Sequence, residues 1–200
     1  RFLNKLLSED YPVVFIDRKP KGYKGDCILG NNIEGAYNAI SILIKKGHSR
    51  IGIITGLPGL TTTEERLFAY KKALSDYKLK IDEDLIKAGN SRFVGGYKST
   101  KELLEHTDIT ALLVTSNSMT VGAIKYLKEK GVTIPGDIAI IGFDDYKWSS
   151  ITEPSLSMIK QPTYYIGEKA STLIIKRIKK EEIGDYKEYR LPTRLIIRYA

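Results

Sequence analysis

The sequence predicts an α/β protein built on parallel β-sheets. Short runs of β-branched residues alternate along the chain with amphipathic stretches of about ten residues or more. This rhythm is typical of βα units, in which a helix crosses from one parallel strand to the next. With 200 residues, of which 42% are hydrophobic, the chain can bury the core of one large domain or of two small lobes.

The first βα unit is predicted close to the amino terminus. A helix is expected at residues 3–7, and Pro12 interrupts it before a strand at 13–16. The continuous apolar run of this strand predicts burial on both faces. Asp17 follows the strand directly.

The remaining elements follow the same alternation. Gly47 and Gly131 stand where a left-handed residue ends a helix at little steric cost. Helices are predicted at 33–46, 64–74, 93–105, 119–130 and 164–180, strands at 51–54, 111–114, 138–141 and 195–197, and an extended segment at 155–161.

Composition excludes several classes of protein. The single cysteine cannot form an internal disulfide, and with two histidines the chain offers no zinc cluster, so no metal or cofactor is expected. No apolar run approaches the roughly 20 residues of a membrane span, and residues 1–12 lack a signal-peptide stretch. These features predict a cytoplasmic protein with no membrane partner.

The net charge of +8 raises the question of nucleic-acid binding. The lysines are spread over the predicted helices, and the densest cluster, at 176–180, coincides with a predicted helix end. Cations there favour the helix dipole, so we interpret the cluster as a solvated helix terminus.

Polar residues follow four of the predicted strands. They are Asp17, the loop at 56–63, residues 115–117, and the pair Asp144 and Asp145. Loops at the carboxyl ends of parallel strands converge on one crevice, so these groups are natural ligand contacts. None is a nucleophile with a partner base, and the chain has no Gly-x-Gly-x-x-Gly, P-loop or Gly-x-Ser-x-Gly motif, so no enzyme activity is expected.

Six motifs stand out, and together they span nearly the whole chain. They are VVFIDR at 13–18, KGHSRIGIITG at 46–56, ER at 65–66 with Tyr70, SNSM at 116–119, IPGDIAIIGFDD at 134–145, and IKQP at 159–162 with Ile166 and Gly167. In this order and spacing, they resemble the motifs of the LacI/GalR family of bacterial transcriptional regulators.

The resemblance implies a periplasmic-binding-protein-like type I fold, with two lobes joined by three crossover segments and an effector held between them. Residues 30–162 and 191–200 are expected to form the carboxy-terminal lobe, and residues 1–29 and 163–190 part of an incomplete amino-terminal lobe. The family's helix-turn-helix, which reads operator DNA, is expected to precede Arg1 and to be absent from this chain.

The resemblance also implies a set of effector-binding residues. Arg66 matches the family's effector-binding arginine, Asp144 its effector-contacting aspartate, and Asp17 the aspartate that reaches the ligand from the other lobe. Phe93 stands near Ser91, where many sugar-binding relatives have a stacking aromatic ring. The full expected set is Asp17, Thr62, Arg66, Phe93, Asn117, Asp144 and Gln161.

Most of these residues, and Asp145 beside them, also have a purely structural interpretation. Arg66 could form a surface ion pair with Glu64 or Glu65, and Asp17 one with Arg18 or Lys19. Asn117 and Asp145 could cap helices. Phe93 could belong to the core, and Gln161 could make a structural hinge bond.

The function implied by the resemblance is an effector sensor. In this reading the chain binds a small polar molecule, a sugar, and thereby controls operator binding by a homodimer. The alternative is a stand-alone periplasmic-type sugar-binding protein of a transport system, which shares the architecture. A nucleotide-dependent enzyme is a third hypothesis, suggested only by the parallel α/β pattern.

Overall fold

The computed structural model describes residues 11–22 and 24–199, which form an α/β structure as predicted. The chain divides into two compact units. The small unit comprises Arg1–Asn31 and Pro162–Pro192, and the large unit comprises Asn32–Gln161 and Thr193–Ala200. The helix predicted at 3–7 lies outside the described residues.

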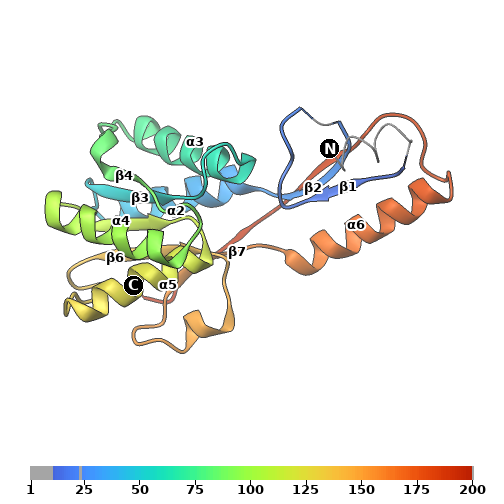
Figure 1. The fold of residues 1–200 in the computed structure, drawn as a ribbon. Helices are drawn as coiled ribbons and strands as arrows, with labels where there is room; N and C mark the ends of the chain where they lie inside the picture. The colour runs from blue at the N-terminus through green and yellow to red at the C-terminus, as the bar shows by residue number, and fades with distance from the viewer. Residues whose placement is uncertain (1–10, 23, 200) are drawn as a thin grey trace. The chain divides into compact units, whose positions relative to one another are not determined.

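The large unit is built on a six-stranded sheet with the order β4-β3-β5-β6-β7-β9. The first five strands are parallel, and β9 pairs with β7 in the antiparallel direction. Figure 1 shows these strands between two layers of helices. The strands are β3 (Ile51–Thr55), β4 (Ile86–Ala88), β5 (Ala111–Val114), β6 (Ala139–Phe143), β7 (Ser157–Lys160) and β9 (Arg194–Ile196).

The period of two along the strands separates two apolar cores, one on each face of the sheet. Ala111 and Leu113 of β5 contribute to the core beneath α2 (Asn32–Lys45) and α3 (Thr61–Asp76). Leu112 and Val114 contribute to the core beneath α4 (Phe93–His106) and α5 (Asn117–Glu129). The central strands β3, β5 and β6 are buried throughout, which explains why they are nearly continuous apolar runs.

Most predicted elements of the large unit are confirmed, with shifted ends. Gly47 and Gly131 have the left-handed φ angles of 96° and 67° expected after a helix. Helix α3 begins at Thr61 and α5 at Asn117, in both cases earlier than predicted. Strand β4 and the short 3-10 helices η1 (Glu83–Leu85) and η2 (Lys147–Ser150) were not predicted.

The small unit contains a three-stranded parallel sheet with the order β1-β2-β8. Helix α6 (Thr163–Ile178) contributes Ile166 and Leu173 to a core around Ile28 of β2. The strands are β1 (Val14–Ile16), β2 (Asp26–Gly30) and β8 (Glu188–Leu191). Neither β2 nor β8 was predicted.

The predicted burial of the first strand on both faces is wrong for the described residues. Strand β1 lies at the edge of its sheet, and Ile16 is 55% exposed. The strand buried throughout is β2, which lies between β1 and β8.

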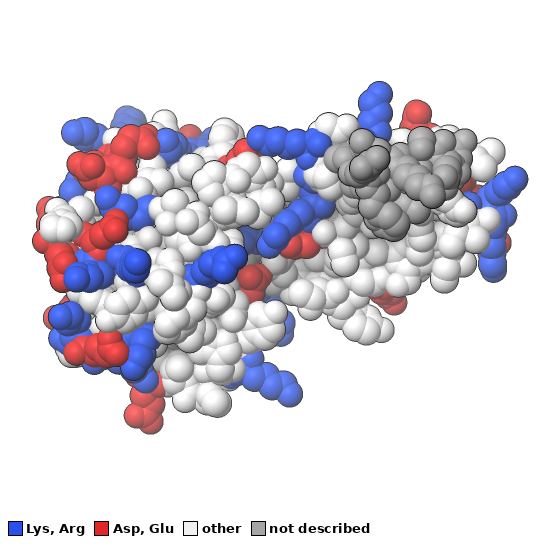
Figure 2. Space-filling model, viewed as in Figure 1, with Lys and Arg blue, Asp and Glu red and all other residues white. Residues whose placement is uncertain are grey.

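The charged side chains of the large unit are well mixed in sign. On the face shown in Figure 2, Lys and Arg are interleaved with Asp and Glu over the large unit, on the left of the view. Several cations form ion pairs, for example Lys72 with Asp76 and Lys125 with Glu129. Within the described range, no helix is both long and apolar enough to cross a bilayer.

The cluster at 176–180 is only partly the solvated helix end that was predicted. Arg177 turns inward and forms a two-pronged pair with Asp26, with Nε 2.8 Å from Oδ2 and Nη2 2.9 Å from Oδ1. The two side chains are 10% and 2% exposed. The same guanidinium donates to the backbone oxygens of Gly184 and Asp185, so it joins α6, β2 and the turn before β8.

We expect Arg177→Ala to destabilise the small unit by about 3–5 kcal/mol, because it leaves the buried Asp26 carboxylate without its cation. Hydrogen exchange at the Cys27 amide, which donates to Lys187 O, measures this change. Lys179→Ala at the same helix end is the control, because Lys179 is 61% exposed. Equal protection in the two variants would show that the pair contributes little.

Candidate functional site

The carboxyl ends of the parallel strands in the large unit form one edge of the sheet, called here the carboxyl edge. From β3 the chain crosses to β4 on one side, whereas from β5 it crosses to β6 on the other side. Connections that leave in opposite directions open a crevice at the carboxyl ends of the two strands. The candidate site therefore lies where β3 and β5 end.

Arg66 of α3 is buried at this edge, with 6% of its surface exposed. Its Nε and Nη2 atoms donate to Asn32 Oδ1 at 2.9 and 2.8 Å, and Nη1 donates to Thr115 O at 2.6 Å. The guanidinium carbon lies 3.5 Å from the ring centroid of Phe143, a stacked cation–π arrangement. The alternative of a surface arginine is therefore wrong.

Asn32 is a site residue that the sequence analysis missed. It begins α2, is 1% exposed, and donates through Nδ2 to Glu65 Oε2 at 2.8 Å. Its side chain thus accepts from Arg66 and donates to the neighbouring glutamate. A polar residue at a predicted helix start is typical of an N-cap, so the local pattern did not indicate that Asn32 binds Arg66.

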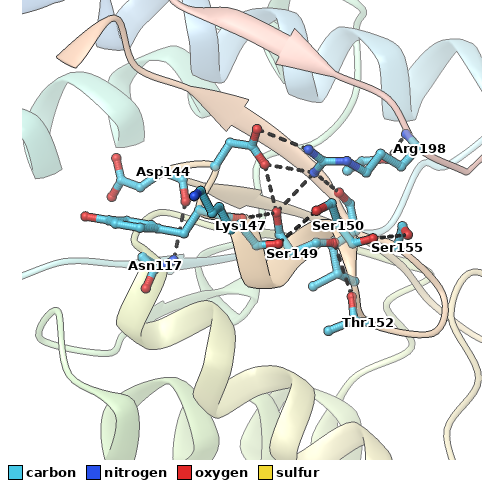
Figure 3. A network of polar contacts seen from close by, with 12 residues as sticks. Asn117, Asp144, Lys147, Ser149, Ser150, Thr152, Ser155 and Arg198 are labelled. Atoms are coloured by element: carbon cyan, nitrogen blue, oxygen red, sulfur yellow. Dashed lines mark hydrogen bonds and ion pairs between the residues drawn. The ribbon is translucent and has the colours of Figure 1, made fainter. Parts of the chain in front are cut away.

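Asp144, Gln161 and Asn117 form a second hydrogen-bonded group at the same edge. Gln161 Nε2 donates to Asp144 Oδ1 at 2.6 Å, and Asn117 Nδ2 donates to Asp144 O at 3.3 Å. Figure 3 shows Asn117 and Asp144 side by side. The Gln161 Oε1 atom is buried and has no hydrogen-bond partner among the described residues.

The helix-capping role considered for Asn117 belongs to its neighbour. Ser116 is the N-cap of α5, and its Oγ accepts from the Met119 amide at 3.4 Å. Asn117 is the first residue of the helix and is half-buried. Its side-chain amide is therefore directed to Asp144 and not to the helix end.

Thr62 and Phe93 lie in the first turns of α3 and α4, respectively. Thr62 is buried, one turn before Arg66. Phe93 is 41% exposed, so the alternative that it belongs to the core is wrong. Ser91, two residues earlier, accepts from the Leu57 amide at 3.2 Å and so bridges the loops after β3 and β4.

Backbone strain is concentrated at the carboxyl ends of strands. Asp17, Asn90, Ser91 and Asp144 have positive φ values of 62°, 53°, 57° and 70°. They follow β1, β4 and β6, whereas the other two non-glycine residues with positive φ, among those described, follow helices. Such conformations cost about 1–3 kcal/mol each and gather at ligand sites.

Asp17 belongs to the small unit. Its amide donates to Ile28 O at 3.1 Å, which places it at the carboxyl end of β1. Its carboxylate lies 3.2 Å from Arg18 Nε, and the two side chains are 41% and 52% exposed. The ion pair with Arg18 that was considered as the alternative thus forms, but exposed pairs of this kind contribute little stability.

Asp145 has a structural role, distinct from the capping role considered for it. Arg198 Nη1 lies 2.8 Å from its Oδ1, and Arg198 Nη2 donates to Oδ2 at 3.1 Å. Burial alone would raise the pKa of Asp145, but hydrogen bonds from Arg198 and Ser149 outweigh it and lower the pKa. The carboxylate is therefore held charged within the protein.

The arrangement is made of hydrogen-bonding groups. The carboxyl edge presents a guanidinium, three side-chain amides and a carboxylate, and all of these groups can hydrogen-bond to hydroxyls. Within the described part of the chain, no group of three or more His, Cys, Asp and Glu residues could hold a metal ion. The chemistry fits recognition of a small polar molecule.

The chain is similar to a known family of binding domains and to known transcriptional regulators. Residues 40–199 match the family described as periplasmic binding protein-like domain. The HTH-type transcriptional repressor PurR of Vibrio atlanticus (strain LGP32) is 32% identical over 174 residues, which cover 86% of this chain and 52% of that protein. The chain thus spans about half the length of the curated relatives it matches.

Two solved structures with sugars are also similar. A LacI family transcriptional regulator from Enterococcus faecium with bound ribose has a TM-score of 0.88 and 27% identity, covering 98% of this chain and 73% of that one. The complex of the transcriptional regulator CelR with cellobiose has a TM-score of 0.87 and 30% identity, covering 92% of this chain and 57% of that one.

The lowered pKa of Asp145 predicts acid sensitivity. A depressed carboxyl pKa contributes stability that is present above the unfolded value of about 3.9 and is lost as the pH falls through the folded value. Urea unfolding between pH 7 and pH 3 should show a fall in the free energy of unfolding that is shallower in Asp145→Asn. Parallel curves for the two proteins would contradict the role assigned to the Asp145–Arg198 pair.

Proposed function

The chain belongs to the periplasmic binding protein-like domain family, in the form carried by LacI/GalR-type regulators, and from this premise we propose that it is the effector-sensing domain of a transcriptional regulator. The observation that carries the proposal is the convergence of Arg66, Asn117, Asp144 and Gln161 at the carboxyl edge. They are hydrogen-bonding groups beside the switch point of a parallel sheet, where small ligands bind in this class of fold.

A sugar is the effector class that these groups fit best. A guanidinium fork suits vicinal hydroxyls, a carboxylate accepts hydrogen bonds from two hydroxyl groups, and an amide donates and accepts at once. Phe93 adds an exposed ring of the kind that stacks on the apolar face of a sugar. The ribose and cellobiose complexes of the similar regulators support this class.

The proposed effector-binding residues differ in importance. Arg66 is the main contact, and Asp144, Asn117 and Gln161 provide further hydrogen bonds to the ligand. Thr62 and Phe93 lie at the starts of α3 and α4. Asp17 of the small unit is proposed as an effector-binding residue on the basis of the family resemblance alone.

Regulation by such a domain requires a coupling free energy. An effector that binds one of two lobe arrangements more tightly shifts the population toward that arrangement. We therefore propose that the chain acts in a cytoplasmic homodimer, whose affinity for operator DNA, read by a separate amino-terminal domain, changes with effector. The relatives are named as transcriptional repressors, which favours this role over transport and over catalysis.

The test is effector binding by an Arg66 variant. A thermal-shift screen over sugars and purines selects a ligand, with D-ribose and cellobiose first, and calorimetry measures its dissociation constant. We expect Arg66→Met to weaken binding about 100-fold, equivalent to about 2.7 kcal/mol, because the variant fills the space but donates no hydrogen bonds. Its stability should also fall by about 1–3 kcal/mol, because Asn32 Oδ1 and Thr115 O lose a donor.

The matched control is Arg50→Met. Arg50 also bridges two segments of the large unit, pairing with Asp82 and Asp108, but at the amino ends of the strands. Its loss should reduce stability without changing effector affinity. Unchanged affinity in a folded Arg66→Met protein would remove Arg66 from the site.

A further inference from the structure

A second arginine, Arg198, organises the loop that follows β6. It lies just beyond β9, and its guanidinium contacts both carboxylate oxygens of Asp145. The same group donates to Leu156 O at 2.7 Å and to Ser149 Oγ at 3.1 Å. Figure 3 shows these contacts as one network, with Arg198 on one side and Asp144 and Asn117 on the other.

The network is enclosed by protein. The side chains of Arg198 and Asp145 are 19% and 9% exposed, and Ser149 is fully buried. The Ser149 hydroxyl lies 2.7 Å from Asp145 Oδ1 and 2.7 Å from Tyr146 O. A shielded, two-pronged pair of this kind fixes orientation as well as position.

Two hydrogen bonds of backbone amides add to the network. The Arg198 amide donates to Ser157 Oγ at 3.1 Å, at the start of β7. The Leu156 amide donates to Ser149 O at 2.8 Å, which closes the loop on itself. Arg198 thus clamps residues 145–156 onto the strand pair β7 and β9.

The residue immediately before this clamp is Asp144, which adopts the left-handed conformation with φ of 70°. Its amide donates to Ile159 O at 2.9 Å, and its carboxylate accepts from Gln161. A non-glycine residue stays in this conformation only where its surroundings enforce it. Because Asp144 and Asp145 share a peptide bond, the grip on Asp145 restricts the backbone of Asp144.

We propose that Arg198 is a positioning residue of the effector site: by holding Asp145, it keeps Asp144 in the strained conformation that directs its carboxylate toward the ligand. This inference rests on the proposed function for its ligand, but the clamp itself acts in the free protein. It separates the two neighbouring aspartates by role, since Asp144 binds the effector and Asp145 holds Asp144 in place.

Hydrogen exchange tests the clamp without any ligand. Arg198→Lys keeps the charge but loses the planar fork, so it cannot bind both oxygens of Asp145 as the guanidinium does. Protection of the Asp144 amide should fall about tenfold, while that of the Thr115 amide, which donates to Ile54 O at the same edge, stays unchanged. The control is Arg50→Lys, which removes the fork at the opposite edge and should leave the Asp144 amide protected.

Two further measurements complete the experiment. Asp145→Asn removes the charge at constant size and should reproduce the local loss of protection at Asp144. Calorimetry with D-ribose should give about tenfold weaker binding for Arg198→Lys and an unchanged affinity for Arg50→Lys.

The outcomes separate the two proposals. Unchanged protection at Asp144, or an equal loss at Asp144 and Thr115, would overturn the positioning role, because the first shows no clamp and the second shows only general destabilisation. Unaltered ribose affinity in a variant with a loosened Asp144 would also overturn it. Failure of the unmodified protein to bind ribose would count against ribose as the effector, while the exchange data still decide the role of Arg198.

Discussion

The large unit is organised around a guanidinium that has been removed from water. Burying a charged group is costly unless hydrogen-bond acceptors replace its hydration. For Arg66 the replacements come from the start of α2, the end of β5 and the ring of Phe143 at the end of β6. These contacts exist only when the strands take their observed order. The same interactions that bury Arg66 therefore stabilise the fold and form the candidate site.

The two edges of the six-stranded sheet differ in character. At the amino ends of the strands, Arg50 joins the segments around Asp82 and Asp108, and His48 Nδ1 lies 2.9 Å from Thr110 Oγ1. At the carboxyl edge, left-handed residues such as Asn90 and Asp144 carry polar side chains. Ion pairs and hydrogen bonds thus stabilise the amino edge, whereas strained backbone is found at the carboxyl edge. This difference is expected when loops at one end of a rigid sheet carry the binding function.

The sequence predicted the parts of the structure that depend on local pattern. Strand β5 is a continuous apolar run, Gly47 ends α2, and Asp144 follows β6, so each carries its own signal. Strand β2 was missed because it is a short run of three apolar residues between Asp26 and Gly30, and one of its two partners, β8, lies far along the chain. The inward turn of Arg177 could not be read either, because its position in a lysine-rich helix end is typical of a solvated residue.

The same reasoning applies to the candidate site. The family motifs pointed to Arg66 and Asp144, whereas Asn32 and Arg198 emerged only from three-dimensional contacts. Both act through a residue that the motifs contain. Supporting residues of this kind stand at positions set by strand order and not by spacing along the chain.

The central claim, that the carboxyl edge of the six-stranded sheet binds the effector, is tested most directly by a ¹⁵N–¹H spectrum of the protein titrated with the sugar that binds best. The account predicts the largest shifts at the Arg66 Nε–H and at the amides of Asn117 and Asp144, with little change around Arg50. Shifts confined to the amino ends of the strands, with the carboxyl edge undisturbed, would contradict it.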